Sequence, residues 1–396
     1  MSVSVVKDKC CMCKNCIRIC KFNAISFVTD EYGFEHVMVD EDKCVNCKQC
    51  DLMCPAMNHY VDHQDLLQCG AAYALNNEDK KHGSSGGLFG VLAKKIIKAN
   101  GIVYGAAFDD NLKLVTTCAE TEDELIPLFK SKYLLCDTGI QFKNIENHLK
   151  NNRIVLYCST PCQIHALKLY LKKDYENLIT VDFVCHGVSS QKIFDSFRDL
   201  YEKENSCKLH SFQFRQKVNN PSSSHYFSLS YEQNNKKIEK NGLYYSYPYY
   251  NAYCKQIICR SNCFDCQYAI KDRVSDITIG DFHTVEKYLK DIDRFDGVSM
   301  FLCNSIKGKK LVDSCKVSLC IKDVPKEILY ANNRFSKSSK DEVDLSIRNT
   351  EDFLGEFFKN GMSKKVKKTL ITKKDYIKLL YYKMPLFLRK IVKGLV

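Results

Sequence analysis

The sequence predicts a mixed α/β (α+β) protein with more than one domain, and three observations support this prediction. The chain has 396 residues, which is too many for one compact core, so two or three domains are expected. Nine of the 23 cysteines fall within the first sixty residues, which indicates a separate N-terminal unit. Between residues 69 and 185, apolar strand-like runs alternate with small polar turns and helical segments, as in α/β proteins.

The composition sets the broad class of the protein. Hydrophobic residues make up 45% and charged residues 27%, which is usual for a globular protein, and no apolar run is long enough for a transmembrane helix. The first residues, MSVSVVKDKC, lack the basic and apolar segments of a signal peptide, so we expect a cytoplasmic protein. In a reducing compartment, 23 cysteines favour metal binding or redox chemistry over disulfides.

The cysteines of residues 1–60 form two runs with the same spacing, C-x2-C-x2-C-x3-C. The first run is Cys10, Cys13, Cys16 and Cys20, and the second is Cys44, Cys47, Cys50 and Cys54. This spacing is typical of two-cluster bacterial ferredoxins, in which the fourth cysteine of each run binds the other cluster. We therefore predict a first ligand set of Cys10, Cys13, Cys16 and Cys54 and a second of Cys44, Cys47, Cys50 and Cys20, each holding a 4Fe-4S cluster. Two zinc sites are the alternative, but zinc prefers separated C-x2-C pairs.

Three further features complete the first seventy residues. Asp30, Glu31 and Gly33 mark a hairpin between two short strands. Cys11, next to Cys10, is expected to point away from the cluster and to pack as a small thiol. Residues 55–68 lack periodicity and are predicted to be a linker.

Residues 69–108 predict a strand (AAYAL), a loop (KHGSSGG), a helix (LFGVLAKKIIKAN) and a second strand (IVYGAAF). Gly101 is expected at the C′ position of that helix. The GSSGG sequence precedes the helix N-terminus, where backbone N–H groups favour phosphate. Serine and glycine are also ordinary helix-capping residues, so the residues alone leave both interpretations open.

Two later segments share one plan, in which an apolar strand runs into a small turn and then a helix. These are RIVLYCSTPCQIHALKLYL and LITVDFVCHGVSS, which place Cys162 and Cys185 beyond the strand ends, where α/β proteins bind ligands. Further on, Cys263 and Cys266 form a C-x2-C pair, with Cys259 just upstream. The other cysteines lack ligand spacing, and most are expected to be core residues.

Several stretches in this order resemble the coenzyme F420 hydrogenase/dehydrogenase beta-subunit family, in its bacterial form with a fused ferredoxin. The matching stretches are SSGGLFGVLA, GIVYGAAFDDNLKLV, SKYLLCDTG, STPCQIHALK, VDFVCHG, FQFRQK and SDITIGDF. With the N-terminal unit, the resemblance covers about three quarters of the chain. It implies residues 61–150 and 151–330 as the two parts of a flavin-binding domain, with FAD as the usual flavin.

The resemblance also implies a set of flavin-binding residues. Ser84, Ser85, Gly86 and Gly87 would line the phosphate side, and Ser131, Lys132, Tyr133 and Thr160 would lie near the ring or its ribityl chain. Lys132 is the implied catalytic residue, because a lysine charge stabilises the anionic reduced ring. Taken without the resemblance, Lys132 is equally a solvated surface lysine. Ser159 and His283 depart from the family pattern, and no residue identifies coenzyme F420 as the substrate.

The family further implies a third cluster in the flavin-binding domain. Two strand-end cysteines and a C-x2-C pair supply four thiolates, so we predict a third ligand set of Cys162, Cys185, Cys263 and Cys266. Cys259 could replace Cys162. In the simplest alternative, Cys162 and Cys185 are only buried residues at strand ends.

The C-terminal residues 331–396 predict a basic helical tail. Residues 364–393 hold eleven Lys or Arg and one acid, so they carry +10 of the net charge of +12. A charge confined to one end does not indicate a nucleic-acid-binding fold. Tyr376, Leu379, Leu380, Lys383, Phe387 and Ile391 approximate one helical face, with a break at Pro385. Such a tail suggests contact with anionic lipid or docking on a partner, or else a helix packed on its own domain.

Two functions follow from these features. The first is an iron–sulfur flavoprotein oxidoreductase, in which clusters carry single electrons and the flavin exchanges two electrons with an organic substrate. The second is a non-enzymatic electron-transfer subunit that delivers electrons to a partner enzyme. In either case, the expected partner is a redox protein or a small electron donor or acceptor.

Overall fold

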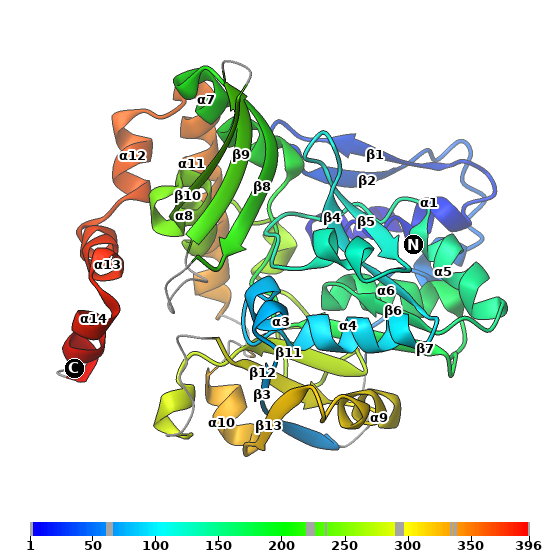
Figure 1. The fold of residues 1–396 in the computed structure, drawn as a ribbon. Coiled ribbons are helices and arrows are strands. Elements are labelled where there is room, and N and C mark those ends of the chain that lie inside the picture. Colours follow the sequence, from blue (N-terminus) through cyan, green and yellow to red (C-terminus); the bar gives the residue numbers. More distant parts are fainter. Residues whose placement is uncertain are drawn as a thin grey trace.

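The structure, a computed structural model, describes residues 3–60, 66–218, 226–233, 236–289, 297–332, 335 and 339–394. Figure 1 shows an N-terminal domain, a large central sheet with helices on it, a smaller sheet and a helical C-terminal tail. The predicted mixed α/β architecture is therefore confirmed, including the separate N-terminal domain and the helical tail. No helix in these described ranges is long and apolar enough to cross a membrane.

The N-terminal domain consists of two short helices and a hairpin. Its elements are α1 (Asn15–Ile19), β1 (Ile25–Thr29), β2 (Glu35–Val39) and α2 (Gln49–Leu52). The strands pair antiparallel from Ile25↔Val39 to Thr29↔Glu35, so the hairpin lies where the sequence predicts it. Asp30 closes the turn, because its side chain accepts hydrogen bonds from the backbone N–H groups of Tyr32 and Phe34, both 2.9 Å.

The central sheet has eight strands in the order β13-β3-β12-β11-β7-β6-β4-β5. Its strands are β3 (Gln68–Ala74), β4 (Ile102–Phe108), β5 (Leu114–Ala119), β6 (Val155–Cys158), β7 (Leu178–Phe183), β11 (Ile277–Asp281), β12 (Ser299–Cys303) and β13 (Leu319–Asp323). The middle four, β4, β6, β7 and β11, are parallel, and the outer strands pair antiparallel. The sheet thus joins strands from residues 61–150 with strands from residues 151–330.

Helices cover both faces of this sheet. Side chains of a strand alternate between the two faces, so Val103 and Leu156 pack with α4 (Leu88–Lys98) and α9 (Ile306–Ser314). Their neighbours along the strands pack on the other face, with α5 (Gln141–Lys150) and α6 (Pro161–Leu171). The result is a three-layer sandwich in which the carboxyl ends of the parallel strands open toward one edge (Figure 1).

The end of α4 differs from the prediction in one residue. Asn100, not Gly101, adopts the left-handed conformation at C′, with a φ of 57°. Gly101 follows it, and its N–H donates to the Ile96 carbonyl at 2.9 Å, as expected for a Schellman motif. Glycine is required there because a Cβ atom would lie 2.6 Å from Ile96 Cγ2.

A second, three-stranded antiparallel sheet was not predicted. It has the order β10-β9-β8 and consists of β8 (Lys208–Gln216), β9 (Tyr226–Gln233) and β10 (Lys236–Leu243). An aromatic core joins it to α7 (Gln191–Asn205), α8 (Pro248–Cys254) and α11 (Lys340–Asn360). Within this core the rings of Phe197 and Phe357 stack with centroids 4.4 Å apart.

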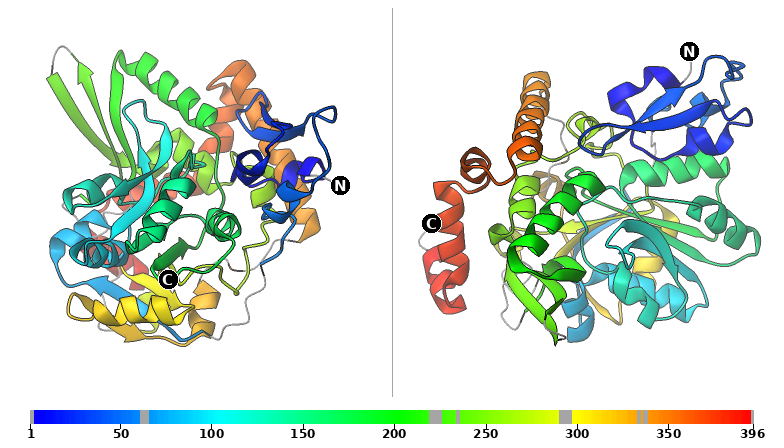
Figure 2. Two further views of the ribbon diagram at one scale, coloured as in Figure 1. Left: turned by 90° about the vertical axis from the view of Figure 1, so that its right-hand side faces the viewer. Right: turned by 90° about the horizontal axis from the view of Figure 1, so that it is seen from above.

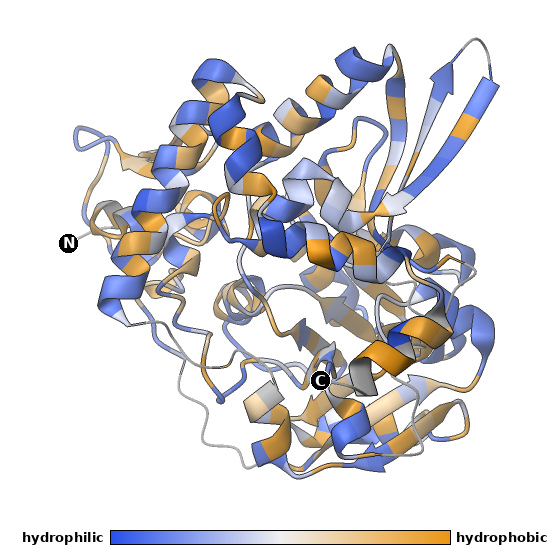
Figure 3. Cartoon of the chain, turned by 90° about the vertical axis from the view of Figure 1, so that its left-hand side faces the viewer, coloured by the Kyte–Doolittle hydropathy of each residue, from blue (hydrophilic) through white to orange (hydrophobic). Residues whose placement is uncertain are grey.

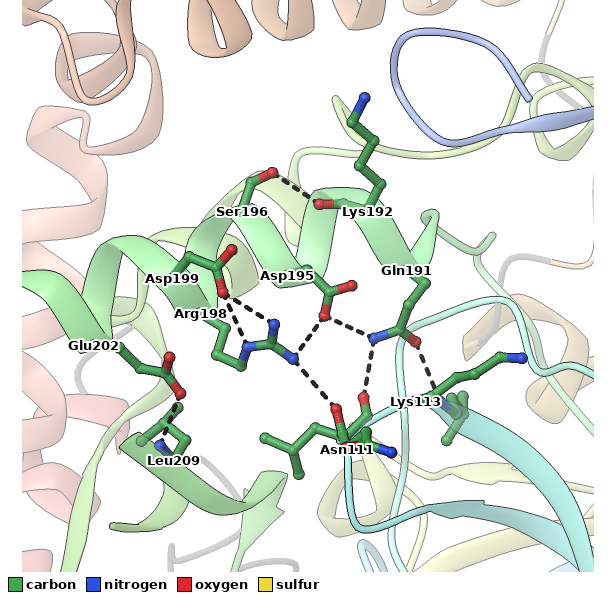
Figure 4. A network of polar contacts seen from close by, with 12 residues as sticks. Asn111, Lys113, Gln191, Lys192, Asp195, Ser196, Arg198, Asp199, Glu202 and Leu209 are labelled. Atoms are coloured by element: carbon green, nitrogen blue, oxygen red, sulfur yellow. Dashed lines mark hydrogen bonds and ion pairs between the residues drawn. The ribbon is translucent and has the colours of Figure 1, made fainter. Parts of the chain in front are cut away.

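Polar contacts on α7 connect the two sheets, as Figure 4 shows. Gln191 donates to the Leu112 carbonyl in the β4–β5 turn at 2.9 Å. Further along the helix, Glu202 accepts from the N–H of Leu209 at the start of β8, at 2.8 Å. These contacts fix the smaller sheet against the open edge of the larger one.

The tail contains α12 (Lys364–Leu370), α13 (Lys373–Lys383) and α14 (Leu386–Gly394), with Pro385 between the last two helices. Two short helices, α3 (Asn77–His82) and α10 (Lys326–Asn332), complete the larger domain. Leu379 was predicted on the outward face of the tail but is half-buried, and exposed Ile377 lies on that face instead. In both views of Figure 2 the elements can be followed by colour, and the right-hand view places α14 and the N-terminal domain at opposite ends.

Candidate functional site

The two cysteine runs adopt the same backbone. Met12 and Lys14 in the first run, and Asn46 and Lys48 at the matching positions of the second, all have φ values between 53° and 61°. Left-handed backbone is uncommon for residues other than glycine, and it carries strain when it recurs at a functional site. Its repetition indicates that both loops are shaped for the same task.

The second ligand set surrounds one small cavity. The four thiols of Cys20, Cys44, Cys47 and Cys50 line a cavity of about 30 Å³, and most other lining residues of that cavity are apolar. The N–H of Ala24 donates to Cys20 Sγ at 3.4 Å, the kind of contact that tunes a cluster sulfur. Four thiols in an apolar setting with an amide donor suit a 4Fe-4S cluster.

The first ligand set is more deeply buried and only partly assembled. Burial raises the pKa of Cys16 to about 12, and the nearby thiols of Cys10 and Cys54 add to this rise. These three cysteines belong to one apolar cluster. Cys13 packs instead with Cys11, in the apolar cluster on the α5–α6 face of the central sheet.

Cys11 is buried, with 8% of its surface exposed. A hydrogen bond with Cys13 is the largest cause that raises the pKa of the Cys11 thiol, and a hydrogen bond with Cys162 opposes it. Cys11 therefore lies between the first cysteine run and the first member of the third ligand set.

The third ligand set comes together from three separate places in the chain. Cys162 lies at the start of α6, Cys185 follows β7, and Cys263 and Cys266 lie in the loop after α8. Burial raises the pKa of Cys185 to about 12, and the thiols of Cys162 and Cys266 add to it. Burial also raises the pKa of Cys263, followed by the thiols of Cys185 and Cys266. The four predicted thiols are thus mutual neighbours.

Cys259 lies beside this set. Its Sγ would be 3.0 Å from a Cβ added at Gly187, and its nearest thiols are Cys263 and Cys185. This position favours Cys162 over Cys259 as the fourth ligand. Among the residues that the structure describes, no three His, Cys, Asp or Glu side chains are arranged to hold a single metal ion.

Buried polar side chains hold the N-terminal domain against the third ligand set. Arg260, only 2% exposed, donates to the carbonyls of Cys10 at 2.8 Å and Glu35 at 2.7 Å. Asn15, 1% exposed, donates to the Ala166 carbonyl of α6 at 2.7 Å. The first cysteine run is consequently fixed at the domain junction.

A larger cavity of about 250 Å³ opens at the carboxyl ends of β6, β7 and β11. The predicted flavin residues that line it are Ser84, Ser85, Gly87, Ser131, Lys132, Tyr133 and Thr160. The same cavity is lined by Cys185, and Thr160 Oγ1 lies 3.2 Å from Cys162 Sγ. The predicted flavin residues and the third ligand set are therefore adjacent.

Gly86 serves a different purpose from the one implied. Its N–H donates to Ser299 Oγ at 3.0 Å, and a Cβ atom there would lie 2.5 Å from the Ala72 carbonyl oxygen. Gly86 is thus required for packing against β3 and β12. Gly87 lines the cavity and has a φ of 83° at the N-cap of α4, a conformation that favours glycine.

Serine hydroxyls and a lysine form one wall of the cavity. Ser84 Oγ accepts hydrogen bonds from the N–H of Ser131 at 2.7 Å and from its hydroxyl at 3.0 Å. Lys132 Nζ donates to the carbonyls of Pro127 at 2.7 Å and Phe129 at 2.6 Å. Burial lowers the pKa of Lys132 to about 7, so a nearby anion would strongly favour its charged form.

An aromatic wall lies opposite. The ring of Tyr133 packs against Tyr253 of α8, with centroids 4.4 Å apart, and both residues line the cavity. Cys136 and Cys158, expected to be core residues, line it as well.

The sequence analysis missed a buried ion pair in this cavity. Arg215 Nη1 lies 2.5 Å from Asp281 Oδ2, and Arg215 Nη2 donates to the Ser84 carbonyl at 2.8 Å. Burial alone would raise the pKa of Asp281, but the Arg215 guanidinium outweighs it and lowers the pKa to about 2. Both residues lie in family-like stretches, FQFRQK and SDITIGDF, which were the available signal. His283 lines the same cavity.

The chemistry of the cavity suits a flavin. Hydroxyl donors, a guanidinium and a lysine can bind an anionic group, and tyrosine rings can pack against an aromatic one. The residues that would hold the cofactor are those of the serine–lysine wall and the Tyr133–Tyr253 wall. The cluster sites pass a similar test through their thiol sets.

Comparison with known proteins adds a family to this geometry. Residues 152–327 match the family described as the C terminus of the coenzyme F420 hydrogenase/dehydrogenase beta subunit, and residues 9–58 match the 4Fe-4S dicluster domain. No curated protein matches the chain.

One solved structure is similar in part, an F420-reducing [NiFe] hydrogenase complex from Methanosarcina barkeri studied by xenon derivatization. The match has 14% sequence identity and a TM-score of 0.40, and it covers 76% of this chain and 97% of that chain. At these values the likeness carries no argument about the site. The two family matches agree with the sequence motifs, and the chain belongs to the coenzyme F420 hydrogenase/dehydrogenase beta-subunit family, with a 4Fe-4S dicluster domain at its N-terminus.

Proposed function

We propose that the protein is an iron–sulfur flavoprotein oxidoreductase that passes electrons between its clusters and a flavin, FAD being the family's usual one. One observation carries the proposal. The cavity lined by Ser131, Lys132 and Tyr133 is also lined by Cys185, a member of the third ligand set. A redox cofactor in that cavity would lie next to a cluster.

When bound, a flavin exchanges single electrons with a cluster and two electrons with an organic substrate. The chain contributes the surroundings. Lys132 and Arg215 supply positive charge to an anionic ring or phosphate, and Arg215 is held in place by Asp281. The linked hydroxyls of Ser84 and Ser131 supply hydrogen bonds, and the tyrosine wall excludes water from one face.

The route of electrons follows the order of the cysteine sets. The second ligand set includes exposed Cys47, so it is the set most open to an external partner. The first set borders the third through Cys11, and the third borders the cavity. We propose transfer along this order, in either direction, with a redox protein or small donor at one end and an organic substrate at the other. The basic tail is proposed to bring the chain to a membrane surface.

The test is the cofactor content of the full-length protein purified without oxygen. Three cubane clusters give about twelve irons per chain, and we expect one flavin with them. About eight irons and no flavin would contradict the proposal and support the non-enzymatic electron-transfer subunit.

A second measurement tests the role of Lys132. Replacing it with alanine removes a buried amine from the flavin cavity, so we expect weaker binding of the reduced flavin and a slower reductase reaction. A Lys132→Ala protein with unchanged flavin content and activity would remove Lys132 from the site. Lys143→Ala, on the exposed side of α5, is the matched control.

A further inference from the structure

The last two helices of the tail expose their apolar side chains. On α13, Tyr376, Ile377 and Leu380 are 61%, 66% and 62% exposed, and on α14, Phe387 and Ile391 are 63% and 56% exposed. Residues at i, i+1 and i+4 lie on one side of a helix, so each helix presents a continuous apolar strip. We call these residues the outer strip. Figure 3 views the molecule from the side of the tail, with α13 and α14 toward the viewer.

The inward side of the same helices is polar. Asp375 is buried, and its carboxylate lies 2.9 Å from Lys255 Nζ at the end of α8. The ring of Tyr382 stacks on Tyr245 with centroids 5.6 Å apart, and Arg389 of α14 is fully buried. A helix that only packs on its own domain turns its apolar side inward, so the tail has the reverse arrangement.

The charge around the outer strip is strongly positive. Lys373, Lys374, Lys378 and Lys383 of α13 are exposed, as are the four lysines of α12. The single acid of residues 364–393, Asp375, is already paired with Lys255. Apolar side chains among lysines match the boundary between acyl chains and anionic headgroups. A neutral protein surface would satisfy the apolar strip but not this charge.

We propose that the outer strip of α13 and α14 is the surface that docks the protein on an anionic lipid bilayer. The inference rests on the membrane contact proposed above and names the face that makes it. Tyr376, Ile377, Leu380, Phe387 and Ile391 enter the headgroup–acyl boundary, and the flanking lysines contact lipid phosphates. Because the N-terminal domain lies at the opposite end of the molecule (Figures 1 and 2), docking leaves the exposed second cysteine run facing water.

This arrangement also brings the bilayer close to the cavity. α13 is paired through Asp375 with the end of α8, and Tyr253 of α8 lines the flavin cavity. The bilayer-side helix therefore backs one wall of the redox site.

The experiment is sedimentation of the full-length holoprotein with vesicles. One vesicle preparation is phosphatidylcholine alone, and the other contains phosphatidylcholine with phosphatidylglycerol. We expect binding only to the anionic vesicles, with a marked loss between about 0.05 M and about 0.5 M NaCl because salt screens surface charge.

Two variants test the two parts of the surface. An apolar variant carries Ile377→Ser, Leu380→Ser, Phe387→Ser and Ile391→Ser, and a basic variant carries Lys373→Gln, Lys374→Gln and Lys383→Gln. Each is expected to weaken anionic-vesicle binding by about tenfold or more. Their controls are Val317→Ser, an 88% exposed apolar residue outside the tail, and the triple change Lys143→Gln, Lys150→Gln and Lys172→Gln. Both controls are expected to bind as the unchanged protein does.

The outcomes separate the docking surface from the redox function. Iron content, flavin content and reductase activity without vesicles are measured on the same preparations, and they also show that each variant is folded. An unchanged protein that stays in the supernatant with anionic vesicles, or variants that bind as tightly as it does, would overturn the docking surface and leave the redox function standing. So would a chain that is dimeric in solution and becomes monomeric in the apolar variant, because the strip would then be a contact between copies.

Discussion

The two cysteine runs share a spacing and a backbone but have opposite surroundings. In the first run, Cys11, Met12 and Asn15 are 8%, 3% and 1% exposed, whereas the matching residues of the second run, Val45, Asn46 and Gln49, are all exposed. The difference comes from the central domain, which covers only the first run. A local sequence can thus build two equal loops, but their position in the chain's tertiary structure decides which is internal and which faces solvent. This favours the second run as the contact for external partners and the first as the internal relay.

The largest expected difference between the runs comes from removing one ligand of each. Cys16→Ser and Cys47→Ser should each lower the iron content by about four atoms per chain. Because cluster binding is coupled to folding, and Cys16 lies in the buried half of the domain, only Cys16→Ser should also lower the melting temperature strongly. Iron analysis and thermal unfolding without oxygen measure both. Equal loss of stability in the two variants would show that burial does not distinguish the runs.

The next largest effect concerns the contact that covers the first run. Arg260 donates to the carbonyls of Cys10 and Glu35 from a buried position, so Arg260→Leu leaves two carbonyls without this donor. We expect a loss of about 3 kcal/mol in the free energy of unfolding, measured by denaturant titration. Arg153→Leu is the control, since Arg153 forms a surface pair with Glu120 at 3.0 Å and should cost less than about 1 kcal/mol.

The outcome that would contradict this prediction is a similar, small loss for both arginine variants. The N-terminal domain would then be held to the central domain by its apolar contacts alone. Arg260→Lys sharpens the result, because a lysine keeps the charge but cannot reach both carbonyls with a fixed fork of donors.

The same comparison explains how much the sequence could predict. Cysteine spacing is a local property, so both runs, the hairpin and the ferredoxin-like domain could be predicted from the residues alone. The third ligand set and the cavity depend on distant segments, and only the resemblance pointed to them. Arg215 and Asp281 were missed because they lie 66 residues apart and meet only in the folded chain. The outer position of Ile377 in place of Leu379 depends on how α13 docks, which helical periodicity does not specify.

The smallest expected effect isolates one pair of matching residues. Asn15 and Gln49 occupy the same place in the two runs, before the third cysteine of each. Asn15 donates to the carbonyls of Ala166 at 2.7 Å and Met53 at 3.2 Å from a buried site, so Asn15→Leu should lower the free energy of unfolding by about 2 kcal/mol. Gln49 is exposed, and Gln49→Leu should change it by less than about 0.5 kcal/mol. Denaturant titration of both proteins, with iron content confirmed first, measures the difference. If the two changes cost the same, the junction between the first run and α6 contributes no more to stability than open surface does, and the internal position of the first run would rest on the Arg260 contact and apolar packing.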